Sequence, residues 1–128
     1  MGSVVREFVI DCADPKRVAT FWSQVLDWPL KEEPTGELWI SSTGEESAPP
    51  PVLIFVTVPE PKTVKNRMHL DVNPSGVDQA EELERLLSLG ARRVDIGQGD
   101  VSWVVLADVE GNEFCLLSSR VDPVAPGA

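Results

Sequence analysis

The chain repeats one order of elements twice, and this repeat limits the folds that are open to it. Residues 7–28 read as a short apolar strand, an Asp-Pro helix start and an amphipathic helix, and residues 69–91 follow the same order. After each helix comes an apolar run that begins at a tryptophan, Trp39 or Trp103, and then a second apolar run. A period of this length is a whole module and not a solenoid unit. Two copies imply a paired architecture.

Composition places the chain among soluble globular proteins. With 128 residues, 42% of them hydrophobic and 25% charged, it is long enough for one domain with its own core. No stretch approaches the roughly 20 apolar residues of a membrane helix. The first residues lack the pattern of a signal peptide, so we expect a cytoplasmic location. Cys12 and Cys115 lie in strand patterns, where reduced, buried thiols are expected.

The net charge of the chain limits the classes of partner that it can bind. A net charge of −10 argues against nucleic acid as a partner, because phosphate binding depends on clustered Lys and Arg. The exception is a short basic run with Lys62, Lys65 and Arg67. This run either attracts an anionic group of a ligand or forms a solvated linker, and we favour the linker.

The first module has clear element signals. Residues 4–12 predict a strand, and Asp14 with Pro15 predicts the start of a helix over about 15–27. Shorter strands are expected at 30–33, 37–42 and 52–58. The apolar face of the helix consists of Val18, Phe21, Trp22, Val25 and Leu26.

The second module repeats this order. We expect a strand at 67–73, a helix at 77–89 that ends at Gly90, and strands at about 91–96, 101–107 and 113–119. The buried stripe of the helix is predicted to be Ala80, Leu83, Leu86 and Leu87. Residues 121–128, with two Pro and one Gly, are expected to fray.

Two βαβββ modules, with the segments VPEPKTVKNRMHLDV and ADVEGNEFCLL, resemble the vicinal-oxygen-chelate superfamily, and in particular its glyoxalase-like domain proteins. The superfamily includes glyoxalase I, extradiol dioxygenases and proteins of bleomycin and fosfomycin resistance. The resemblance covers about residues 4–119. It implies a single α+β domain with modules at about 4–60 and 65–120, whose curled mixed sheet encloses one cavity.

The resemblance also implies places for metal ligands on the first and last strand of each module. In this chain those places hold Glu7, Ile54 or Phe55, His69 and Cys115. Neither Ile54 nor Phe55 can bind a metal. A site of Glu7, His69 and Cys115 would suit zinc better than magnesium or manganese, and zinc, nickel and manganese are the divalent cofactors to consider.

His69 is the only histidine, and it lies on a strand whose alternate residues face the implied cavity. It is a metal ligand, a general base or a hydrogen-bonded lining residue. Asp71 lies two residues on and therefore on the same face, so it either tunes the imidazole as a catalytic partner or faces solvent. Cys115 is expected to be a packed thiol and not a nucleophile.

Aromatic residues are the candidates for ligand contact. Trp39 and Trp103 occupy matching places in the two modules, and with Phe55 they could line the cavity as a clamp for a flat or apolar molecule. If the tryptophans face the helices instead, they belong to the core. Strand alternation alone does not decide between the two.

Three functions follow. In the first, the protein binds a small, partly apolar molecule between its modules and the metal site is degraded. In the second, it is a metal-dependent lyase or isomerase similar to glyoxalase I that uses Glu7, His69 and Cys115. The third is a metal-free activity of His69 and Asp71. By analogy with the family we expect a homodimer.

Overall fold

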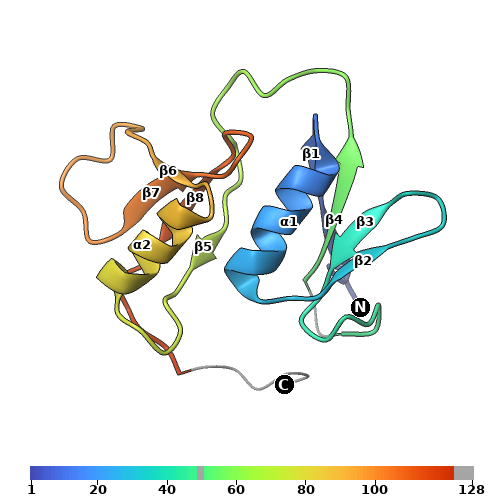
Figure 1. Ribbon diagram of the computed structural model, residues 1–128, viewed down its shortest axis with the longest axis horizontal. Coiled ribbons are helices and arrows are strands. Elements are labelled where there is room, and N and C mark those ends of the chain that lie inside the picture. Colours follow the sequence, from blue (N-terminus) through green and yellow to red (C-terminus); the bar gives the residue numbers. More distant parts are fainter. Residues whose placement is uncertain (49–50, 123–128) are drawn as a thin grey trace. The chain divides into compact units, whose positions relative to one another are not determined.

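The computed structural model describes residues 1–48 and 51–122, which fall into two compact units, Met1–Pro61 and the chain from Lys62 onward. Each unit contains a strand, a helix and three further strands, in that order (Figure 1). The predicted repeat of two βαβββ modules and the α+β class are therefore confirmed.

The first unit builds one four-stranded sheet in the order β1-β4-β3-β2. The strands β1 and β4, which come first and last along the chain, pair in parallel. The pairs β4–β3 and β3–β2 are antiparallel. The elements are β1 (Glu7–Cys12), α1 (Pro15–Leu26), β2 (Leu30–Glu32), β3 (Leu38–Ile40) and β4 (Val52–Thr57).

Helix α1 begins where the sequence predicts. The carboxylate of Asp14 accepts a hydrogen bond from the backbone N–H of Arg17 at 3.2 Å, and Pro15 needs no such partner. The helix packs on β3 and β4 (Figure 1). Burial of each large apolar side chain on this face contributes about 1.5–3 kcal/mol. The buried residues are Val18, Ala19, Phe21, Trp22 and Val25.

The two faces of the first sheet differ in what covers them. On β4, Leu53 and Phe55 are fully buried on the side of α1, whereas Val52, Ile54 and Val56 alternate with them and point to the other side. That other face is open enough to leave Val9 of β1 53% exposed. The first unit thus has an apolar sheet face that its own helix does not cover.

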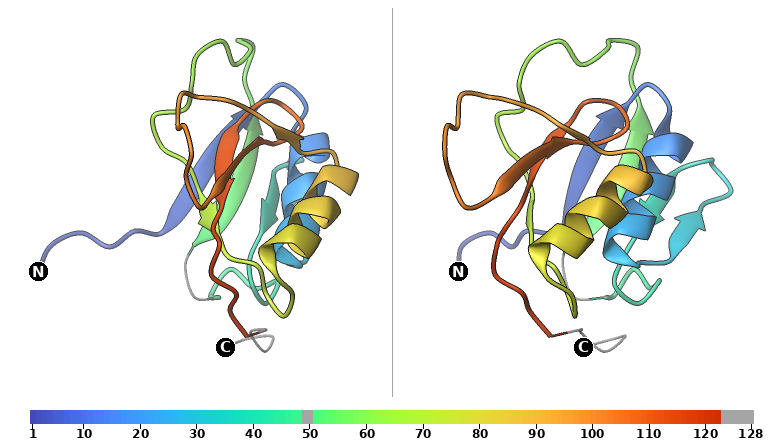
Figure 2. Two further views of the ribbon diagram at one scale, coloured as in Figure 1. Left: turned by 90° about the vertical axis from the view of Figure 1, so that its left-hand side faces the viewer. Right: turned by 60° about the vertical axis from the view of Figure 1, so that its left-hand side comes forward.

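The second unit repeats the topology with a sheet in the order β5-β8-β7-β6, and α2 lies across one face of it (Figures 1 and 2). Leu106, Phe114 and Leu116 of this sheet are fully buried, as is Leu86 of α2. The elements are β5 (Asp71–Val72), α2 (Gln79–Ser88), β6 (Arg92–Arg93), β7 (Val104–Ala107) and β8 (Glu113–Leu116).

The helix of the second unit differs in detail from the prediction. It begins after Asp78, whose carboxylate accepts from the N–H of Glu81 at 2.9 Å, and not at Val77. The predicted stripe was half wrong, because Ala80 and Leu87 are exposed. Glu82 takes the buried place instead, since a two-point hydrogen bond from Arg85, at 2.7 and 2.9 Å, satisfies its carboxylate.

Most strands are shorter than the sequence suggests, because the predicted pattern extends beyond the residues that pair as regular strands. The clearest case is the predicted strand at 67–73, of which only Asp71–Val72 pairs as β5. Val121, assigned to the frayed tail, forms a bridge with Ser75. Residues 123–128 of that tail lie outside the described residues. In the part of the chain described, neither helix has the length and apolar character of a membrane span.

Candidate functional site

Three polar side chains converge in the second unit. His69, Asp71 and Cys115 each offer a ligand atom, and these atoms all lie within 4.8 Å of one another. The His69 Nδ1 atom lies 3.0 Å from the Asp71 Oδ1 atom. The predicted contact between His69 and Asp71 on one strand face is therefore present, and the cysteine of the last strand joins it.

Strand pairing brings these residues together. Asp71 of β5 stands opposite Cys115 of β8 in the parallel pair, and His69 precedes Asp71 by two residues and shares its face. The pairing extends past β5, because the backbone N–H of Cys115 donates to the carbonyl of Leu70 at 2.9 Å. His69 and Asp71 are each about half exposed, whereas Cys115 is only 6% exposed.

The surroundings of Cys115 disfavour its thiolate. Burial raises the pKa of the Cys115 thiol, and the negative charge of Asp71 and a hydrogen bond to that carboxylate raise it further. Lys65 opposes this shift. A thiol held in its protonated form is a poor nucleophile. The structure thus agrees with the expectation of a packed cysteine.

The basic run before β5 is tied to the same sheet. Lys62 donates to Glu113 at 2.8 Å, and the backbone N–H of Asn66 donates to the other carboxylate oxygen at 3.3 Å. Burial would raise the pKa of Glu113, but these hydrogen bonds hold it below its ordinary value. Lys62 is therefore engaged with the protein itself and is not part of a solvated linker, and this contact fixes the segment that leads to His69.

The two sheets can be compared row by row from their internal pairing. In the second unit Asp71, Cys115 and Val105 lie side by side across three strands. When Glu7 is matched to His69, as the family resemblance implies, the corresponding row of the first unit holds Val9, Ile54 and Trp39. In this comparison, Asp71 and Cys115 of the second unit correspond to Val9 and Ile54 of the first unit.

This comparison corrects the pairing of the two tryptophans. Trp39 matches Val105 and not Trp103, because the segments before β3 and β7 differ in length. Trp103 precedes β7 and is 41% exposed. The comparison also shows that Ile54, and not Phe55, is the counterpart of Cys115. Phe55 is 1% exposed and lies in the core beside α1.

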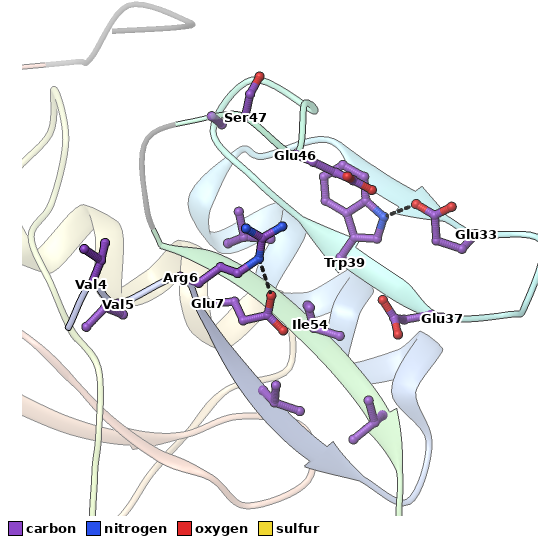
Figure 3. A pocket seen from close by; sticks show the side chains of 14 residues that line it. Val4, Val5, Arg6, Glu7, Glu33, Glu37, Trp39, Glu46, Ser47 and Ile54 are labelled. Atoms are coloured by element: carbon purple, nitrogen blue, oxygen red, sulfur yellow. Dashed lines mark hydrogen bonds and ion pairs between the residues drawn. The ribbon is translucent and has the colours of Figure 1, made fainter.

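The open face of the first sheet carries a hollow of about 760 Å³ (Figure 3). Its volume lies within the range of small-molecule sites. Trp39 lines it, and its Nε1–H donates to the Glu33 carboxylate at 2.8 Å. Glu7 also lines it and pairs with Arg6 at 3.5 Å. The floor is apolar and consists of Val9, Val52, Ile54 and Val56.

The three donors of the second unit suit a particular class of metal ion. An imidazole, a carboxylate and a thiolate are the ligands of zinc, and three protein ligands leave a fourth position open. Manganese prefers oxygen ligands, so a thiol in the set disfavours it. Asp71 was predicted as a partner of His69, and the structure places it where it could also be a ligand.

Sequence reasoning missed the acidic border of the hollow. Glu33, Glu37 and Glu46 all line it. One of them had a signal in the sequence, because Glu37 precedes Trp39 by two residues and therefore shares its face. The other two come from turns whose course the sequence did not give.

Comparisons with known proteins agree on the fold. The sequence model of a family described as a glyoxalase-like domain matches residues 7–117. The fosfomycin resistance protein FosX from Mesorhizobium loti has a similar structure, with a TM-score of 0.67, 13% identity and coverage of 93% of this chain and 94% of that one. No curated protein sequence matches the chain.

Two further structures show the same fold. FosX from Listeria monocytogenes, in a complex with Mn(II) and sulfate, has a TM-score of 0.64 and 13% identity over 93% of this chain and 94% of that one. The oxidase ChaP-H2 has a TM-score of 0.59 and 13% identity over the whole of both chains.

The environment of Cys115 leads to a testable prediction. In a Cys12→Ala background, where Cys115 is the only thiol, Asp71→Asn should lower the pKa of Cys115, because it removes the negative charge but keeps a hydrogen-bonding side chain. The pH dependence of alkylation by iodoacetamide measures this pKa. Asp100→Asn, an exposed aspartate of the same unit, is the control. An unchanged profile in Asp71→Asn would contradict the assigned cause.

Proposed function

Since the chain belongs to the glyoxalase-like domain family of the vicinal-oxygen-chelate superfamily, we propose that it binds a small, partly apolar molecule. The open face of the first sheet forms a wall of the binding site. The observation that carries this proposal is the hollow of about 760 Å³ on that face, with its apolar floor and the Trp39 indole. Its floor residues Val9 and Ile54 pair across the first sheet as Asp71 and Cys115 pair across the second.

The energetics of this face favour an apolar ligand. Val9 is half exposed although it lies in mid-strand, so a bound molecule would remove apolar surface from water at about 25 cal/mol per Å². The Glu33 carboxylate fixes the indole of Trp39 through the hydrogen bond to Nε1, and a fixed aromatic wall loses little entropy on binding. Trp39 and the floor are the proposed ligand contacts, in place of the predicted set of Trp39, Phe55 and Trp103.

A matched pair of valine variants tests this proposal. Val9→Glu places a carboxylate on the floor of the hollow, whereas Val64→Glu places one at an exposed site of the second unit. We expect Val9→Glu to weaken the binding of the neutral fluorescent probe N-phenyl-1-naphthylamine by about 10-fold, since an apolar ligand would desolvate the new charge. Val64→Glu should bind like the parent. Equal affinities for both variants, or no binding by the parent, would contradict the proposal.

A second candidate function is a metal-dependent lyase or isomerase. The group of His69, Asp71 and Cys115 favours it, because these three donors could hold zinc. A bound zinc ion would polarise a carbonyl oxygen of the substrate. Compared with the set of Glu7, His69 and Cys115, this set draws all its ligands from the second unit.

Cobalt titration of the full chain, prepared without a metal-affinity tag, tests the metal site. Co²⁺ should give a thiolate-to-cobalt absorption band at one equivalent, because Cys115 would be a ligand. Cys115→Ala should abolish this band, while Cys12→Ala, which alters the buried cysteine of the first unit, should retain it. A band that survives in Cys115→Ala, or the absence of binding, would contradict the site. In the latter case the metal-free activity of His69 and Asp71 is the enzymatic alternative.

The expected homodimer and the cytoplasmic location stay predictions that rest on the family resemblance and on composition.

A further inference from the structure

We propose that the ligand of the first sheet is an organic cation, a molecule with an apolar body and a positively charged amine or quaternary ammonium group. This inference rests on the proposed function and adds the charge of the ligand to it. It comes from the residues that surround the apolar floor of the hollow, and not from the floor itself.

The lining of the hollow is strongly acidic. Four carboxylates line it, those of Glu7, Glu33, Glu37 and Glu46, against the single guanidinium of Arg6. Arg6 pairs with Glu7, and these two residues come from β1 and the segment before it. In residues 1–48 and 51–122, no ion pair joins Glu33, Glu37 or Glu46 to a Lys or Arg. Among the described residues, no ion pair therefore neutralises the negative charge of these three glutamates.

The carboxylates without an ion-pair partner among the described residues lie at one end of the hollow. Glu37 directly precedes β3, Glu33 is bonded to the Trp39 indole, and Figure 3 shows both on the Trp39 side of the hollow. The Arg6–Glu7 pair belongs to the β1 side, and β4 lies between β1 and β3. A ligand with its charge at one end and its apolar part at the other would match this asymmetry.

Trp39 adds a second attraction for a cation. The face of an indole attracts an ammonium group, and the attraction grows where water is excluded. Because Nε1–H is bonded to a carboxylate, the ring is held in place at the acidic end. Lys31 stands opposite Trp39 across the β2–β3 pair, but it does not line the hollow, and its side chain lies against Gly44.

The glutamates do not form a metal site. Among the described residues, the group of acidic, histidine and cysteine side chains that converges within ligand distance is His69, Asp71 and Cys115, in the other unit. The hollow's carboxylates are instead spread around an apolar surface. Spread charges stabilise a diffuse organic cation, whereas a small metal ion needs several ligand atoms at one point.

Other occupants fit less well. A second copy of this chain would bring a net charge of −10 toward an acidic hollow, so like charges would oppose the contact. An anionic molecule would meet the same repulsion. A cationic small molecule is attracted by the whole chain and fits the volume of about 760 Å³.

Three naphthalene derivatives that share a naphthylmethyl body and carry a cationic, a neutral or an anionic head group test the inference on the full chain. They are (naphthalen-1-ylmethyl)trimethylammonium, 1-naphthylmethanol and 1-naphthylmethanesulfonate, each titrated by calorimetry at low salt. We expect the cation to bind about 5- to 10-fold more tightly than the alcohol and the sulfonate to bind weakest. Added salt should reduce this preference, because the Glu37 and Glu46 carboxylates are exposed.

The double variant Glu37→Gln, Glu46→Gln should lower the preference for the cation over the alcohol by about 3- to 10-fold, because it removes two of the negative charges of the lining. Both residues are exposed, so the fold should tolerate the change. Glu84→Gln, on the exposed side of α2, is the matched control and should have no effect.

The possible outcomes test the cation proposal separately from the proposal that the protein binds an apolar molecule. Binding of all three compounds with similar affinity would overturn the cation proposal and leave the binding of an apolar molecule intact. Binding of none of them would overturn both. A preference for the cation that persists in the double variant would place the charge recognition elsewhere and would also overturn the proposal.

Discussion

The parallel pairing of the first and last strand of each module is the constraint on which the rest of the structure depends. It joins residues about 45 positions apart, as in the pairs Val9 with Ile54 and Asp71 with Cys115. Because side chains alternate across a strand, the pairing also decides which residues share the face away from the helix. A shift by one residue would turn Cys115 into the core and Phe114 out of it. The polar group of the second unit and the hollow of the first are both products of this register.

The same register carries different chemistry in the two units. The row of Val9, Ile54 and Trp39 offers apolar and aromatic contacts, whereas the row of Asp71, Cys115 and Val105 offers a carboxylate and a thiol beside His69. The two units therefore share the same strand positions, but the side chains at those positions differ in chemistry. We infer a division between a face that contacts the apolar part of a ligand and a group that suits zinc.

Much of the fold could be predicted from the sequence, because its signals are local. Asp14 and Pro15 begin α1, and the spacing of His69 and Asp71 gives a shared face. The signals failed where the result depends on distant pairing. Trp39 and Trp103 seemed equivalent by sequence distance, but the register pairs Trp39 with Ile54 and leaves Trp103 ahead of its strand. The hollow was out of reach for the same reason, since its acidic residues come from β1, from the turn between β2 and β3, and from the segment after β3.

The open face of the first sheet, and not the core beside α1, is the proposed contact surface for the ligand. Nuclear magnetic resonance of the chain labelled at Val, Leu and Ile methyl groups, titrated with (naphthalen-1-ylmethyl)trimethylammonium, tests it most directly. We predict that the largest shifts fall on Val9, Val52, Ile54 and Val56, with little change at Leu53 on the buried face. Shifts centred on Leu53, or confined to the second unit, would contradict ligand contact at the open face.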